Sequence, residues 1–83
     1  MFPPKINSIK PLEDMKLFVT FRNGVNKVYD VKHLIDEYPD FEILRNPSIF
    51  NMVKVDSGGC GVSWNDNIDF PENELWVNGI LIP

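Results

Sequence analysis

The chain has 83 residues, 43% of them hydrophobic and 24% charged, which is near the smallest size at which one domain buries a self-sufficient core without disulfides or metals. Its formal net charge of −4 leaves no basic surplus for phosphate backbones or anionic lipids, which argues against nucleic acid as a partner of this domain alone. No apolar run approaches the ~20 residues that span a bilayer, so we expect a single domain over residues 1–83 with no membrane association.

The cysteine content indicates the redox compartment. Cys60 has no second cysteine with which to form an internal disulfide, and its place between Gly59 and Gly61 is typical of a thiol at a strand edge. We therefore expect a reducing, cytoplasmic location.

Residues 5–12 and 16–21 are the first two predicted strands. Pro11 lacks the N–H that a central strand needs, so residues 5–12 are predicted to form an edge strand. Residues 16–21 alternate between two faces, and Asn23-Gly24 follows them as the strongest hairpin signal in the chain.

A two-residue loop at this point would set the register of the hairpin. Val19 then faces Val28, and Phe18 faces Tyr29. The side chains that this register directs to the core are Leu17, Val19, Phe21 and Val28. It leaves Phe18 and Tyr29 together on the opposite face, where a helix, another chain or nothing covers them.

Two short helices are predicted next. Asp30 is the expected N-cap of the first, because a carboxylate accepts hydrogen bonds from the free amides of a first helical turn. Its apolar stripe, at helical spacing, consists of Val31, Leu34, Ile35 and Tyr38, before Pro39. Asn46 is the expected cap of a second helix that begins at Pro47.

The last third of the chain predicts a second hairpin and a final helix. Residues 53–55 and 62–64 alternate on either side of Gly58-Gly59, which supplies the positive φ of a tight turn. A turn at 65–67, a strand at 68–70 and a helical segment at 71–77 follow. The sequence therefore predicts an α+β fold with a mainly antiparallel sheet of about five strands and two or three short helices.

No set of residues predicts catalytic, cofactor-binding or metal-binding chemistry. Asp56, Asp66 and Asp69 could in principle pair as acid and base or hold a hard cation, but their spacing lacks the glycine and glutamate of a calcium loop. Turns and backbone caps explain these acids better. His33 lies off the apolar stripe, which is typical of a solvated surface histidine. We expect no enzymatic activity, no cofactor and no metal.

The order of these elements resembles the bacterial family known as domain of unknown function 2442. The resemblance covers nearly the whole chain, and its motifs are specific through their order and spacing. They are Ile9-Lys10-Pro11-Leu12, Lys16-Leu17-Phe18-Val19-Thr20-Phe21, Asn23-Gly24, Tyr29-Asp30-Val31, Phe50, Val53-Lys54-Val55-Asp56, Gly59, Val62-Ser63-Trp64, Ile68-Asp69 and Glu74-Leu75-Trp76.

The resemblance implies a compact α+β domain, either free-standing or joined to a helix-turn-helix DNA-binding domain. Genes of this family often lie next to a gene for another small protein, an arrangement similar to toxin–antitoxin pairs. The resemblance thus implies a protein partner, the product of a neighbouring gene, and it carries no catalytic residues over to this chain.

We therefore expect a non-catalytic protein-interaction module, as the antitoxin-like member of a two-gene pair. Two alternatives stay open: a regulatory protein related to helix-turn-helix fusions, and a small acid-dependent hydrolase. Apolar surface left over from the fold predicts a partner contact or a symmetric homodimer. The predicted contact residues are Phe18, Tyr29, Trp76, Ile80, Leu81 and Ile82.

Overall fold

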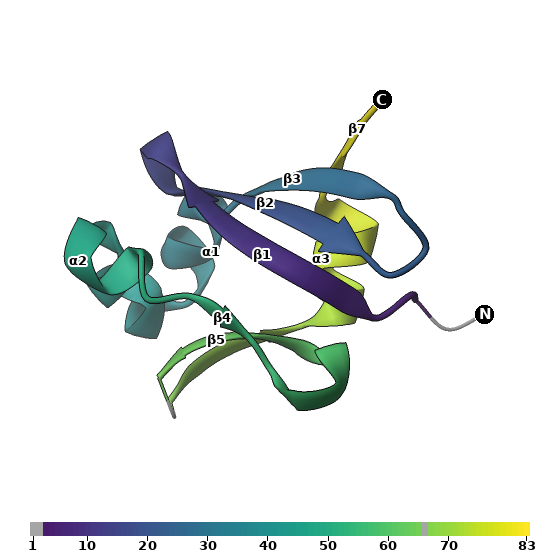
Figure 1. Ribbon diagram of the computed structural model, residues 1–83. Coiled ribbons are helices and arrows are strands. Elements are labelled where there is room, and N and C mark those ends of the chain that lie inside the picture. The colour runs from purple at the N-terminus through teal and green to yellow at the C-terminus, as the bar shows by residue number, and fades with distance from the viewer. Residues whose placement is uncertain (1–2, 66) are drawn as a thin grey trace.

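The computed structural model describes residues 3–65 and 67–83, and its strands form two antiparallel sheets (Figure 1). The first sheet has the order β1-β2-β3-β7, and its strands are β1 (Ile6–Leu12), β2 (Lys16–Phe21), β3 (Asn26–Asp30) and β7 (Ile80–Ile82). The second has the order β4-β5-β6, with β4 (Lys54–Val55), β5 (Gly61–Asn65) and β6 (Ile68–Pro71). The α+β class is confirmed, but the strands divide between two sheets instead of sharing one.

The two sheets meet through a loop contact near the start of β1. The 3₁₀ turn η3 (Ser57–Gly59) precedes β5, and a Cβ added at Gly59 would lie 2.6 Å from the backbone oxygen of Ile6. Only a residue without a side chain lets the backbones approach this closely. This packing of a turn against the strand edge is a long-range contact, which the alternation pattern could not predict.

Three short helices and two further 3₁₀ segments complete the described part of the chain. Their bounds are α1 (Lys32–Glu37), α2 (Pro47–Phe50), α3 (Glu72–Asn78), η1 (Glu13–Met15) and η2 (Pro39–Arg45). Within residues 3–65 and 67–83, no helix has both the length and the apolar character needed to cross a membrane.

Two predicted caps act largely as expected. The Asn46 side chain accepts a hydrogen bond from the Ser48 N–H at 3.0 Å and starts α2 at Pro47. The Asp30 carboxylate accepts from the Lys32 N–H at 2.9 Å at the start of α1, although Val31 holds the N-cap position itself. Local side-chain oxygens thus satisfy amides that lack a partner in the helix.

The core fills the space between the two sheets and the helices. Phe70 on β6 lies at its centre, with its ring 5.4 Å from that of Trp64, 6.0 Å from that of Tyr29 and 4.7 Å from that of Phe41. The buried core side chains are Ile6, Leu17, Val19, Phe21, Tyr29, Val31, Leu34, Leu44, Phe50, Val62, Trp64, Ile68, Phe70 and Leu75.

The β2–β3 hairpin differs from the prediction by one residue. The Phe21 N–H donates to the Val25 carbonyl at 2.9 Å, so the loop holds three residues and not two. Gly24 ends this loop in the left-handed region, with φ at +88°, which is the usual form of a three-residue hairpin loop. The Asn23 side chain accepts from the Val25 N–H at 3.0 Å and supports the turn.

This shift moves side chains from one face of the sheet to the other. Leu17 pairs with Tyr29 and Phe18 pairs with Val28, because a slip of one residue exchanges the two faces of a strand. Tyr29 is therefore buried in the core, and Val28 lies beside Phe18 on the opposite face. The predicted pairing of Phe18 with Tyr29 and the predicted core position of Val28 are both wrong.

We expect the Gly24→Val substitution to lower the free energy of unfolding by about 1–2 kcal/mol, the usual cost of a left-handed backbone for an L-residue. Among the described residues, no heavy atom lies within 4 Å of a Cβ built at Gly24, so the loss would report backbone strain. Gly24→Asn is the matched control, because asparagine tolerates this conformation, and it should lose less than about half as much. Urea denaturation measures both, and equal midpoints for the two variants would contradict the left-handed conformation of Gly24.

Candidate functional site

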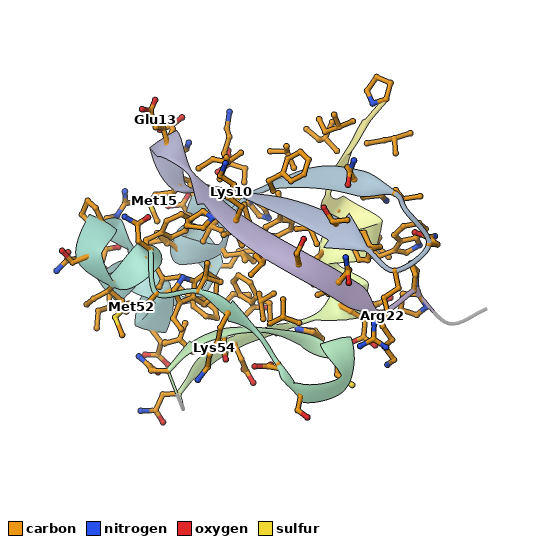
Figure 2. The ribbon with its side chains drawn as sticks, viewed as in Figure 1. Lys10, Glu13, Met15, Arg22, Met52 and Lys54 are labelled. Atoms are coloured by element: carbon orange, nitrogen blue, oxygen red, sulfur yellow. The ribbon has the colours of Figure 1, made fainter. Side chains whose placement is uncertain are left out.

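One face of the four-stranded sheet carries apolar side chains that the core does not use. This outer face carries Phe18, Val28, Ile80 and Ile82. The strand register places Lys10, Phe18, Val28 and Ile80 in one row across all four strands. Figure 2 shows Lys10 pointing away from the second sheet, and Figure 1 shows no helix on that side of the described chain.

Strand β7 forms an open edge of the same sheet. It pairs with β3 through Asn26–Ile82, Lys27–Leu81 and Val28–Ile80, and no described strand lies beyond it. Its side chains stay exposed, by 70% at Ile80, 61% at Leu81 and 37% at Ile82. An uncharged edge strand with free backbone groups lacks the usual protection against pairing with another chain.

The structure places only part of the predicted contact residues on the outer face. Phe18, Ile80 and Ile82 lie on the outer face, and Leu81 lies on the other side of β7. Tyr29 is buried and takes no part in this surface. Trp76 on α3 is half-buried.

The ring of Trp76 packs against side chains of the same chain. It meets Phe21 edge to face at 5.0 Å, and the Lys27 ammonium lies 4.0 Å from its ring centre. That ammonium also donates to the Trp76 carbonyl. Val28 is an outer-face residue that sequence reasoning missed. Gly24 was the one local signal for it, because a glycine in this position also fits the end of a three-residue loop.

The acids considered for catalysis lie along a polar face of the second sheet. Asp56 accepts a hydrogen bond from the Ser63 hydroxyl at 2.6 Å, and Asp69 is the cross-strand neighbour of Ser63. Both acids line one shallow polar cavity with Lys54. Asp66 lies outside the described residues. Within residues 3–65 and 67–83, no group of three acidic, histidine or cysteine side chains is placed to hold a metal ion.

A buried phenol organises a small polar cluster on α1 and α3. The Tyr29 hydroxyl donates to the Glu74 carboxylate at 2.7 Å and lies 3.3 Å from His33 Nε2. Asn78 donates to the same carboxylate oxygen at 2.8 Å. Burial, followed by the hydrogen bond to Glu74, raises the pKa of Tyr29, so the phenol is a neutral donor that holds the carboxylate in place. His33 is exposed, as predicted.

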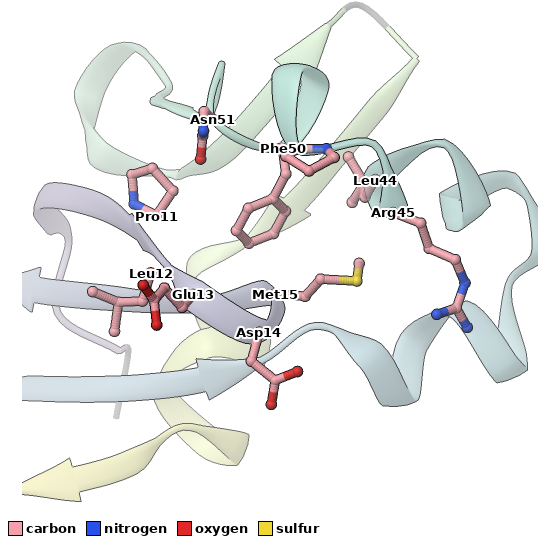
Figure 3. Close-up of a pocket in the computed structure, with 10 residues that line it drawn as sticks. Pro11, Leu12, Glu13, Asp14, Met15, Leu44, Arg45, Phe50 and Asn51 are labelled. Carbon is pink, nitrogen blue, oxygen red and sulfur yellow. The ribbon is translucent and has the colours of Figure 1, made fainter.

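A cavity of about 430 Å³ lies between η1 and the segment that includes α2 (Figure 3). Its apolar lining includes Met15 and Phe50, and Asp14 and Arg45 bring charges of both signs. Asp14 and Met15 have left-handed φ values of 61° and 57°, a conformation that costs energy for such residues.

Contacts to α1 hold this strained turn in place. Lys32 donates to the Asp14 carbonyl at 2.8 Å and pairs with its carboxylate at 2.7 Å, which lowers the pKa of Asp14. The Val31 N–H donates to the Met15 carbonyl at 3.0 Å. The strain is therefore explained by the fold, and the mixed charges of the cavity favour no single class of ligand.

Comparison with known proteins identifies one family and one similar fold. A family model described as protein of unknown function (DUF2442) matches residues 6–80. The crystal structure of a putative DNA binding protein from Nitrosomonas europaea superposes with a TM-score of 0.73 at 23% sequence identity, over 92% of this chain and 49% of that chain. The chain thus spans about half the length of that protein, and the likeness establishes a shared fold alone. No curated protein matches the chain.

We expect Tyr29→Phe to make the fold less sensitive to alkali. The folded-state pKa of Tyr29 is raised above its ordinary value of 10.0. The contribution of the neutral phenol to the free energy of unfolding is therefore complete below pH 10. Above that pH the unfolded chain loses the proton first, and stability falls by up to about 1.4 kcal/mol per pH unit. Urea unfolding between about pH 9 and 11.5 should give a shallower slope for Tyr29→Phe than for the wild type.

The other tyrosine of the chain is the control for this measurement. Tyr38 is 53% exposed, and Tyr38→Phe should keep the wild-type slope. A wild-type slope in Tyr29→Phe as well would mean that the buried phenol is not held neutral.

Proposed function

The chain belongs to the DUF2442 family, and on that premise we propose that it is a non-catalytic protein-interaction module that works through the outer face and β7. The occupant that we propose for this surface is a second copy of the chain. The observation that carries the proposal is the uncharged, open edge at Ile80, Leu81 and Ile82.

The shape of this edge suits a two-fold contact. Antiparallel pairing of β7 with the β7 of a second copy, centred on Leu81, would set Ile80 opposite Ile82 in both directions. It would join the two sheets and place the exposed isoleucines beside each other on a continuous outer face. Pro83 has no N–H, so the pairing would end there.

The placement of the acids supports the non-catalytic part of the proposal. General acid–base catalysis most often uses a histidine beside the carboxylates. The cavity that Asp56 and Asp69 share has no histidine or cysteine among its described lining residues, and Asp56 accepts a hydrogen bond from the Ser63 hydroxyl. The exposed thiol of Cys60 agrees with a cytoplasmic setting for the module.

An antitoxin-like role is the more specific form of this proposal. In that role a different protein, encoded by a neighbouring gene, would compete with the second copy for the same edge. The resemblance to paired genes supports this form by analogy.

A regulatory role is the second candidate, favoured by the likeness to a putative DNA binding protein. The likeness leaves about half of that protein unmatched, and this chain carries a net charge of −4. In a regulator of this kind, the present domain would mediate protein contacts, and another part would bind DNA.

We expect the chain to sediment as a dimer at micromolar concentration. The Ile80→Ser variant should weaken the dimer by about tenfold or more, because each copy loses part of a buried apolar side chain. Sedimentation equilibrium of both proteins measures the change.

Ile43→Ser is the matched control. Ile43 is 45% exposed and lies on η2, which is not part of the four-stranded sheet, so its loss should leave the dimer unchanged. A monomeric wild type, or an equal effect of both variants, would contradict the homodimer.

We expect the isolated chain to give no electrophoretic shift of duplex DNA at physiological salt. The reason is the lack of a basic surplus for counterion release. A shift that persists when the DNA sequence is varied would show that this domain contacts DNA itself, and would overturn its assignment to protein contacts.

A further inference from the structure

A groove with an aromatic floor lies between helical segments and β6, on elements other than the strands that carry the outer face. Its larger part, about 450 Å³, lies between η2, β6 and α3, and a second part of about 250 Å³ continues along α1. The two parts share Leu34, Tyr38 and Glu74. No residue of β1, β2, β3 or β7 lines either part, so the groove is separate from the surface proposed above.

Three aromatic rings shape the floor and wall of the larger part. Phe41 packs on Phe70 at 4.7 Å and meets Tyr38 edge to face at 5.9 Å. Tyr38 remains 53% exposed although it was predicted on the apolar stripe of a helix. A large aromatic side chain that stays outside the core and lines a cavity is a candidate for ligand contact.

The rim of the groove carries carboxylates without a cation. Asp40 and Glu74 line the larger part, and Glu37 and Glu74 line the smaller. No lysine or arginine lines either part, and no ion pair among the described residues reaches these three acids. Carboxylates around an apolar floor focus a negative potential into the groove.

Hydrogen bonds fix the carboxylate of Glu74 in an orientation that leaves one oxygen free for a cationic donor. One of its carboxylate oxygens accepts hydrogen bonds from both Tyr29 and Asn78, and the other accepts none from the described residues. A carboxylate fixed in this way loses little conformational entropy when a donor binds the free oxygen.

We propose that this groove binds an arginine-bearing peptide segment of a partner protein. A guanidinium group stacks on aromatic faces and donates to carboxylates in a planar fork, which matches a floor of Tyr38 and Phe41 beside Asp40 and Glu74. The groove extends over two connected cavities, so it holds more than one side chain. Two arginines at alternate positions of an extended segment, about 7 Å apart, would place one in each part.

The test uses the whole chain and a blocked peptide, acetyl-Gly-Arg-Gly-Arg-Gly-amide. Titration followed by ¹H–¹⁵N NMR should give saturable shifts at the amides of the groove, including Asp40, Phe41 and Ile68. The same peptide with citrulline in place of arginine keeps the shape but loses the charge. The citrulline peptide should bind at least about fivefold more weakly than the arginine peptide, because it lacks two charge-assisted contacts.

Variants of the chain distinguish binding in the groove from non-specific attraction by the net negative charge of the domain. The double variant Glu37→Gln/Asp40→Asn should weaken binding of the arginine peptide by about threefold or more. Asp36→Asn/Asp69→Asn removes the same charge from exposed sites outside the groove and should change binding little. Tyr38→Leu keeps an apolar wall without the ring and should weaken binding by about two- to fivefold.

Three results would overturn the proposal. The citrulline peptide could bind as tightly as the arginine peptide, or the control double variant could weaken binding as much as the groove double variant. Free butylguanidinium could also bind as tightly as the peptide, which would make the groove a site for a small cation and not for a peptide segment. None of these results depends on whether the chain forms a dimer, so the test is independent of the proposed function.

Discussion

The positive φ of Gly24 closes the first hairpin with three residues, and this loop length fixes which side chains of β2 and β3 face the core. It turns Tyr29 inward, where the phenol bonds Glu74 and so prepares one wall of the aromatic groove. It turns Val28 outward, where it joins Phe18 and the β7 residues on the outer face. Both surfaces that we assign to partners therefore depend on one backbone conformation.

The two surfaces differ in how firmly the fold holds them. The groove is built on Phe70, whose ring contacts side chains from both sheets and from η2, so its floor is continuous with the core. Strand β7 has three residues, and among the described strands it pairs with β3 alone. A strand this short gains little from its own ladder, and a second strand on its open side would add hydrogen bonds on its free edge. Rigid aromatic packing suits recognition of a side chain, while an open strand suits association of backbones.

Local patterns in the sequence predicted much of the fold. The edge strand that contains Pro11, the cap at Asn46 and the hairpin at Gly58-Gly59 each depend on residues close in the chain, and each is present in the structure. The hairpin register failed because Asn23-Gly24 fits both a two-residue and a three-residue loop. The division into two sheets and the groove depend on contacts between distant segments, such as Gly59 with Ile6, which no local pattern contains. Of the candidate site, the apolar tail at residues 80–82 was predictable, and the pairing of that tail with β3 was not.

The separation of the two surfaces has a consequence for binding. Since no residue of the groove lies on the sheet that would form the dimer, two copies joined at β7 would each keep a free groove. A partner that carries two basic segments, or that is itself a dimer, could then occupy both grooves at once. The second contact would form at a high effective concentration, so weak individual sites would give tight overall binding. A small acidic domain with few strong contacts of its own could gain affinity and selectivity for a partner in this way, because only a partner with suitably spaced basic segments would engage both sites.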